Sequence, residues 1–151
     1  MPRPPVVLCV DDDRGTLVAS AHLLSTRGYD VIATDCAKLA LGVLQEQGVD
    51  IIVTDYDMPG MNGAHFAARV KAEKYGKPIL LRSGFLNITP SATRNVDALS
   101  PKGRSAESFL ADVDALCQTA AVAHQADLNH KTCSVLQESK LGGNDVAEAN
   151  L

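Results

Sequence analysis

The acidic residues of this chain gather at the ends of two short apolar runs. The segment Asp11–Asp13 follows directly on Val6–Val10, and the segment Asp55–Asp57 follows closely on Ile51–Val53. Each run is continuous and rich in β-branched residues, which predicts a strand buried on both faces, as in a parallel sheet. Since ligands of such sheets bind beyond the carboxyl ends of the strands, we expect these carboxylates to lie together at one edge.

Two further polar side chains are expected at the same edge. Ser83 follows the apolar run Pro78–Leu81, and Lys102 follows a fifth strand that we expect at about Ala98–Ser100. A hydroxyl and an ammonium group would therefore join the carboxylates. Arg82 precedes the serine and is expected to flank the site.

Carboxylates that converge in this way can hold a metal ion and support phosphoryl transfer. They would raise each other's pKa unless a cation neutralised them. Magnesium suits such a site, because it takes oxygen ligands and keeps several waters. An aspartate beside that metal can attack phosphorus and form an aspartyl phosphate, a reaction that depends mainly on positioning and on charge neutralisation.

The segments between the strands are expected to be helices. Apolar residues recur at helical spacing in three of them. These residues are Leu17, Ala21 and Leu24 in the first segment, Leu39, Val43 and Leu44 in the second, and Phe66 and Val70 in the third. Gly28 and Gly48 stand where the first two helices should have C-caps, and Asn62 is a candidate N-cap of the third.

Three later or weaker elements complete the pattern. Asp30–Ala33 is a weaker strand signal. Residues 85–96 have few periodic apolar residues, so a fourth helix should be short or irregular, with Thr89 as N-cap and Pro90 as its first residue. A last helix is expected after Ser105. Its inward-facing residues would be Phe109, Val113 and Leu116.

Strands that alternate with helices over short connections predict an α/β fold. The expected architecture is a doubly wound, five-stranded parallel sheet that spans residues 5–117. From about residue 118 the periodicity fades, and the remaining segment is small and polar. We expect residues 118–151 to extend the last helix and then to be disordered.

The composition argues against several classes of protein. Hydrophobic residues make up 46% of the chain and charged residues 21%, as in ordinary globular domains. The net charge is −4 and the basic residues are scattered, which argues against direct nucleic-acid binding. No segment predicts a signal peptide or a membrane span. The four cysteines have no metal-type spacing, which favours reduced thiols and a cytoplasmic location.

Four segments carry a family resemblance. In chain order they are VVLCVDDD, IIVTDYDMPGMNG, ILLRSG and DALSPKG. Together they resemble the receiver domain of two-component response regulators, over about residues 5–117. The second segment is the most specific, because it joins a strand-end aspartate to Met-Pro-Gly and a further glycine. The resemblance implies the flavodoxin-like receiver fold in a stand-alone, single-domain protein.

The resemblance also implies roles for individual residues. Asp55 would be the phosphoacceptor. Mg²⁺ would be held by the carboxylates of Asp11, Asp12 and Asp55 and by the backbone carbonyl of Asp57. Ser83 would be the switch hydroxyl, and Lys102 would pair with the phosphoryl group. The donor would be a histidine kinase or a phosphotransfer protein, and the chain would be a signalling protein rather than an enzyme acting on other substrates.

Three departures from the family pattern are visible. Leu99 stands where an aromatic residue is frequent, and Gly103 replaces the proline that usually follows the lysine. The interval between Ser83 and Lys102 is short, and the shortfall lies in residues 85–96. We therefore expect the phosphorylation chemistry to be intact but its relay to differ from that of relatives.

Two other functions are compatible with parts of the pattern. The departures would allow a pseudo-receiver that binds partners without phosphorylation. The Asp55–Asp57 segment also resembles the start of aspartate-nucleophile phosphohydrolases of the haloacid dehalogenase type. That class favours Thr or Val where Pro59 stands, and it needs a downstream acidic pair that the sequence lacks.

Overall fold

The computed structural model describes residues 3–84, 87–123, 125–126 and 128. The chain divides into two compact units, Met1–Cys117 and Gln118–Leu151. In the second unit residues 118–123 are helical, and the disorder expected further on concerns residues 129–151, which lie outside the described part. None of the described helices is both long enough and apolar enough to cross a membrane.

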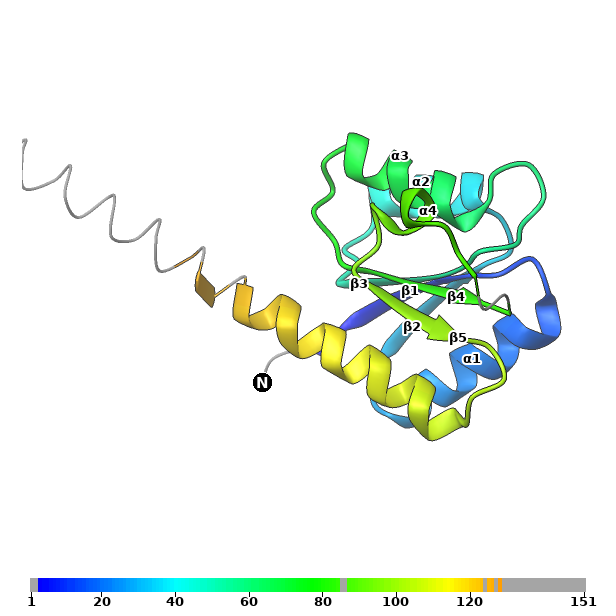
Figure 1. Cartoon of the computed structure of the whole chain (residues 1–151). Helices are drawn as coiled ribbons and strands as arrows, with labels where there is room; N and C mark the ends of the chain where they lie inside the picture. Colours follow the sequence, from blue (N-terminus) through cyan, green and yellow to red (C-terminus); the bar gives the residue numbers. More distant parts are fainter. Residues whose placement is uncertain (1–2, 85–86, 124, 127, 129–151) are drawn as a thin grey trace, which may run out of the picture. The chain divides into compact units, whose positions relative to one another are not determined.

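The first unit is built on one five-stranded sheet with the order β2-β1-β3-β4-β5 (Figure 1). Every neighbouring pair is parallel. The strands are β1 (Val6–Val10), β2 (Asp30–Thr34), β3 (Ile51–Asp55), β4 (Ile79–Ser83) and β5 (Ala98–Pro101). The predicted doubly wound parallel sheet is confirmed. Its strand order reverses between β1 and β3, and at such a point α/β proteins bind their ligands.

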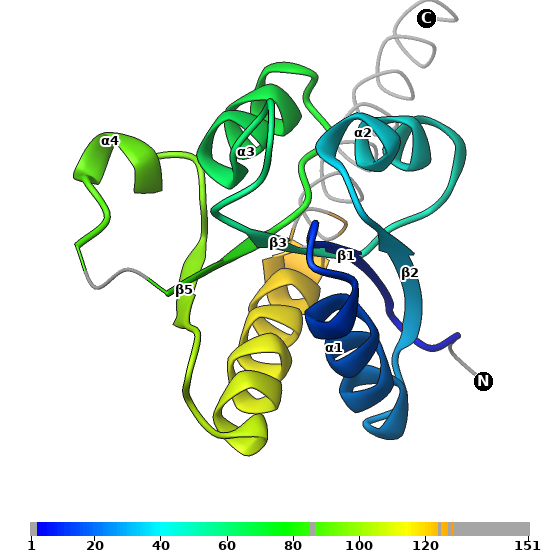
Figure 2. The same cartoon turned by 90° about the vertical axis from the view of Figure 1, so that its right-hand side faces the viewer.

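Helices cover both faces of the sheet (Figure 2). They are α1 (Arg14–Thr26), α2 (Ala37–Glu46), α3 (Gly63–Ala72), α4 (Pro90–Thr93) and a last helix that begins at residue 106. One core cluster joins the sheet to α1 and to the part of the last helix up to residue 117, and the other joins it to α2 and α3.

The two cores explain the continuous apolar runs. In β1 the side chains of Val7 and Cys9 belong to the first cluster, whereas those of Leu8 and Val10 belong to the second. Because successive side chains of a strand point to opposite faces, a strand covered on both sides needs an apolar residue at every position. Each large side chain buried in this way contributes about 1.5–3 kcal/mol.

Several local signals act as the sequence predicts. Asn62 caps α3, since its side chain accepts a hydrogen bond from the His65 amide at 2.9 Å. Thr89 caps α4, and Pro90 is the first residue of that helix, which has four residues. Gly28 follows α1 with φ of 96°, in the left-handed region that favours glycine.

The buried face of α2 differs from the prediction. Leu39 is 57% exposed, whereas the predicted Leu44 is buried together with Ala37 and Ala40. Steps of three and four residues from Ala37 reach the other two, so the face is helical in period but consists largely of alanine. The large side chain of Leu39 was a misleading signal, because small residues let a helix lie close to a sheet.

The predicted C-cap of α2 is also wrong. The cap is Gln47, whose φ of −126° is extended, and Gly48 does not adopt positive φ. The Gln47 amide donates to the Val43 carbonyl at 2.8 Å, which closes the last turn without a left-handed residue.

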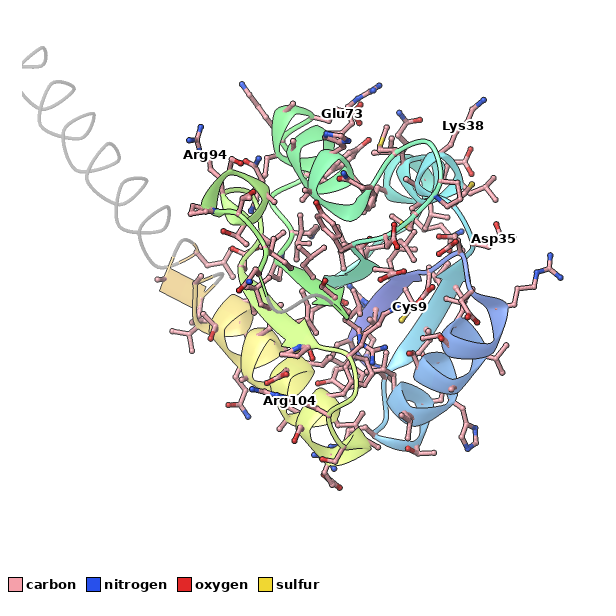
Figure 3. All side chains as sticks on the ribbon, turned by 45° about the vertical axis from the view of Figure 1, so that its right-hand side comes forward. Cys9, Asp35, Lys38, Glu73, Arg94 and Arg104 are labelled. Atoms are coloured by element: carbon pink, nitrogen blue, oxygen red, sulfur yellow. The ribbon has the colours of Figure 1, made fainter. Side chains whose placement is uncertain are left out.

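Cys9 is expected to be chemically inert in the folded protein. Its side chain lies inside the domain, whereas Lys38 and Arg94 point outward (Figure 3). Burial raises the pKa of the Cys9 thiol to about 12. Because only the thiolate is nucleophilic, Cys9 should react with iodoacetamide at pH 8 roughly a thousandfold more slowly than the half-buried Cys36. Peptide mass spectrometry after timed alkylation measures both rates, and equal rates would contradict the burial of Cys9.

Candidate functional site

The register of the sheet brings the two acidic segments together. Val10 in β1 lies opposite Thr54 in β3. The next residues, Asp11 and Asp55, therefore emerge side by side at the carboxyl edge. The Asp11 amide also donates to the Thr34 carbonyl of β2 at 3.2 Å, which ties the backbone at Asp11 to that strand.

Three carboxylates meet at this edge. Asp11, Asp12 and Asp55 each offer one oxygen, and these oxygens lie within 4.8 Å of one another. Asp11 and Asp55 are buried, with 6% and 5% of their surface exposed, and Asp12 is exposed. Closely spaced carboxylates of this kind destabilise one another in the absence of a cation. Their oxygen-only donor set fits Mg²⁺, with room for waters on the exposed side.

The electrostatics of Asp11 show this repulsion. Burial raises the pKa of the Asp11 carboxyl, and the neighbouring charge of Asp55 raises it further. Two interactions oppose the rise. The Asp13 amide donates to Asp11 Oδ1 at 2.9 Å, and the ammonium of Lys102 lies nearby. The net effect is a raised pKa, so the ionised form of Asp11 costs stability until further positive charge arrives.

Lys102 supplies part of that positive charge. Its Nζ lies 2.9 Å from Asp55 Oδ1 and 3.5 Å from Asp11 Oδ2. Burial lowers the pKa of Lys102, but the hydrogen bond to Asp55 and the charges of both carboxylates outweigh that effect and raise it overall. The lysine is therefore a fixed cation between the two buried carboxylates.

The turn after β5 places this lysine. The Lys102 amide donates to the Ser83 carbonyl at 2.8 Å, which ties the turn to the end of β4. Gly103 has φ of 92°, so the chain turns through a conformation that residues with a Cβ rarely adopt. No peptide bond in the described residues is cis, that between Lys102 and Gly103 included. Leu99, at the position of the frequent aromatic residue, is 46% exposed.

The remaining predicted residues line the same edge. Ser83 is buried at the end of β4, one residue beyond Arg82, which lies opposite Asp55 in the register. Asp57 follows β3 with an exposed side chain. The loop that contains it is closed by a hydrogen bond of 2.8 Å from the Gly63 amide to the Tyr56 carbonyl. The structure thus gathers Asp11, Asp12, Asp55 and Lys102 in direct proximity and leaves the Asp57 side chain pointing to solvent.

Asp13 has a structural task instead. Its side chain accepts a hydrogen bond from the Thr16 amide at 3.1 Å and caps α1. Its carboxylate is therefore engaged by the backbone at the start of that helix. Capping fixes the start of α1 directly behind the acidic pair.

Known proteins resemble this chain in sequence. The model of the response regulator receiver domain matches residues 7–98. A putative two-component response regulator of Arabidopsis thaliana, ARR21, is 32% identical over 89% of this chain and 27% of its own length. The sensor histidine kinase GacS of Pseudomonas protegens is 35% identical over 51% of this chain and 9% of its own. The chain thus spans about a quarter or less of the length of these relatives.

Solved structures resemble it in fold. The response regulator StyR has a TM-score of 0.74 at 26% identity, over 85% of this chain and 67% of its own. The response regulator TrrA of Thermotoga maritima, solved in complex with Mg²⁺-BeF, has a TM-score of 0.70 at 20% identity, over 74% of this chain and 98% of its own.

The fold is that of the CheY-like receiver domains. The chain belongs to the response regulator receiver domain family of two-component systems.

Proposed function

We propose that this receiver accepts a phosphoryl group on Asp55 in a magnesium-dependent reaction and signals through the altered surface of the phosphorylated form. The observation that carries the proposal is the environment of Asp55. Its buried carboxylate is paired with Lys102 at 2.9 Å and lies beside the carboxylates of Asp11 and Asp12. A nucleophile, a fixed cation and a metal-binding pair are the groups that acyl phosphate formation needs.

The transfer uses these groups as follows. A carboxylate oxygen of Asp55 attacks phosphorus while the bond between phosphorus and the donor's imidazole nitrogen breaks, and the imidazole keeps the electron pair and takes up a proton. Lys102 would pair with a phosphoryl oxygen, and the Ser83 hydroxyl would donate to another. Asp11, Asp12, Asp55 and the backbone carbonyl of Asp57 would hold Mg²⁺, which would supply positive charge to neutralise the phosphoryl group. TrrA, which shares the fold, was solved in complex with Mg²⁺-BeF, and this supports magnesium as the cation.

The partners follow from the same chemistry. The donor is a histidine kinase or a phosphotransfer protein, and the likeness to a segment of the sensor kinase GacS supports a place in a phosphorelay. The chain catalyses only its own phosphorylation and dephosphorylation. Its net charge of −4 favours a protein target over nucleic acid or a membrane surface, and the proposed location is the cytoplasm.

Acetyl phosphate tests this function without knowledge of the kinase. With Mg²⁺ and acetyl phosphate, intact-protein mass spectrometry should show the gain of one phosphoryl group. When EDTA is present from the start, no such gain should appear. Asp55→Asn should abolish the gain. Asp57→Asn is the matched control, since it alters an exposed carboxylate two residues away and keeps the backbone carbonyl, and it should still be phosphorylated.

Other outcomes would overturn the proposal. No mass gain in the folded wild-type protein would favour a pseudo-receiver. Phosphorylation that persists in Asp55→Asn would place the acceptor elsewhere. Continuous release of phosphate from simple phosphate esters would favour a phosphohydrolase.

A further inference from the structure

Arg82 is a charged residue in an otherwise apolar buried strand. The sequence of β4 is ILLRS, and all of its other residues are buried. Leu80, two residues earlier on the same face, belongs to the core cluster that faces α1 and the last helix. The side chain of Arg82 therefore enters that layer from the end of the strand, beneath the acidic edge of the sheet.

The contacts of Arg82 join both helices of this layer. Its Nη1 donates to the buried Ser20 Oγ of α1 at 2.8 Å. Its guanidinium carbon lies 4.2 Å from the centroid of the Phe109 ring in the last helix, a cation–π contact. Its Nε is buried and has no hydrogen-bond partner among the described residues. Packing thus fixes the Arg82 guanidinium in place, although not all of its N–H groups have acceptors among the described residues.

The charge of this group faces the acidic site. A small cavity of about 10 Å³ is lined by Arg82, Ser20 and Cys9 and by both buried carboxylates, Asp11 and Asp55. Its volume corresponds to about one water, so little material separates the guanidinium from the carboxylates. Burial lowers the pKa of Arg82, but the charges of Asp11 and Asp55 act in the opposite direction, and arginine stays protonated at any physiological pH.

We propose that Arg82 is a positioning residue that neutralises Asp11 and Asp55 from the core side and thereby weakens the affinity of the site for Mg²⁺. The proposal rests on the proposed function, because it assumes that this site binds the cation. Lys102 and Arg82 then act on the same two carboxylates from opposite directions. Lys102 approaches from the turn after β5, whereas Arg82 approaches from the layer beneath, where the metal does not enter.

Removal of the Arg82 charge should therefore increase the affinity of the site for Mg²⁺. Without Arg82 the buried carboxylates are less neutralised, so the binding free energy of a divalent cation is more favourable. At the effective dielectric constant of a protein, one unit charge removed at such close range should tighten Mg²⁺ binding by at least roughly tenfold. A residue that merely packed α1 against the last helix would lower the stability of the domain equally with and without Mg²⁺.

Arg82→Gln tests the proposal, because glutamine is neutral but can still donate to Ser20. The Mg²⁺ dissociation constant is measured by calorimetric titration of the full chain. The stabilisation by Mg²⁺ is measured separately in urea unfolding followed by circular dichroism. Tighter binding increases that stabilisation at a given Mg²⁺ concentration. Arg82→Lys keeps the charge and should retain an affinity near that of the wild type.

Ser20→Ala is the structural control, since it removes the hydrogen bond and leaves both charges. It should lower stability without changing the Mg²⁺ dissociation constant. If Arg82→Gln does not fold in metal-free buffer, Ser20→Ala is compared with Arg82→Lys instead. Equal shifts in Mg²⁺ affinity in both variants would overturn the proposal, because they would show that the hydrogen bond and not the charge matters.

The outcomes separate the two proposals. Tighter binding in Arg82→Gln alone supports the role of Arg82. An unchanged dissociation constant in Arg82→Gln, with normal binding in the wild type, overturns that role and leaves the proposed function intact. A wild-type protein that binds no Mg²⁺ overturns the proposed function itself.

Discussion

Replacement of Gly63 by alanine is expected to destabilise the domain by about 3 kcal/mol. An added Cβ would collide with the Asp55 carbonyl oxygen, and it would lie 2.7 Å from Leu81 Cδ1 and 2.9 Å from Tyr56 Cα. Two of these three atoms belong to the backbone, so no change of side-chain rotamer relieves the contact. The start of α3 must move away from the end of β3, or β3 must move.

This movement would also reach the candidate site. Asp55 supplies both the colliding carbonyl and the carboxylate that pairs with Lys102 at 2.9 Å. Phosphorylation by acetyl phosphate should therefore slow by more than the loss of stability explains. Urea unfolding followed by circular dichroism gives the stability, and the rate of mass gain at a temperature where the variant is folded gives the activity.

Gly42 is the matched control. It lies inside α2, and an added Cβ there would meet no atom within 4 Å. Gly42→Ala should stabilise the domain by about 0.5–1 kcal/mol, because alanine loses less entropy in a helix than glycine. If Gly63→Ala were as stable as Gly42→Ala, the close approach of α3 to β3 would be refuted.

The sequence predicted the sheet well because its strands are buried on both faces. A strand such as Val6–Val10 needs apolar side chains at every position, and that demand leaves a continuous run that is easy to recognise. The aspartates stand out against it, since nothing in a buried strand favours a charge at its end. Order along the chain and the rule for parallel strands then suffice to gather Asp11 and Asp55.

Features that depend on three-dimensional packing were harder to predict. The buried face of α2 rests largely on Ala37 and Ala40. Alanine is a good helix former at any position, so it is a weak signal of burial, and the larger Leu39 was predicted to be buried. Arg82 was recognised only as a residue flanking the site. The available signal was its position inside ILLRS, but the sequence does not show that the side chain turns toward Ser20 and Phe109.

The differences in signal relay expected from the sequence concern α4 and Leu99. The sequence predicted a short fourth helix, and α4 has four residues. Leu99 is exposed and carries no ring that could move into a space beside Ser83. Residues 85 and 86 lie outside the described part of the chain, so the expectation that the relay differs from that of relatives stays a prediction.

Asp11→Asn is expected to be more stable than the wild type without Mg²⁺ and less stable than the wild type with it. In metal-free buffer at neutral pH the variant should be more stable than the wild type, because it removes a buried charge that repels Asp55. The sign follows from the raised pKa of Asp11. A group whose pKa is raised by folding contributes stability below its unfolded value of 3.8, and this contribution is lost as pH rises through the folded pKa. The advantage of the variant should therefore be absent at low pH and appear as the pH rises.

With Mg²⁺ bound, the wild type should be more stable than Asp11→Asn. Binding at a concentration one hundred times the dissociation constant stabilises a protein by about 2.7 kcal/mol, and the variant should lose most of this gain with one ligand missing. Asp35→Asn is the control, because the ion pair of Asp35 with Arg14, at 3.7 Å, is exposed, and its loss should change stability little under either condition. Unfolding curves of all three proteins with EDTA and with Mg²⁺ provide the comparison. If Mg²⁺ stabilised Asp11→Asn as much as the wild type, Asp11 would not be a ligand of the metal.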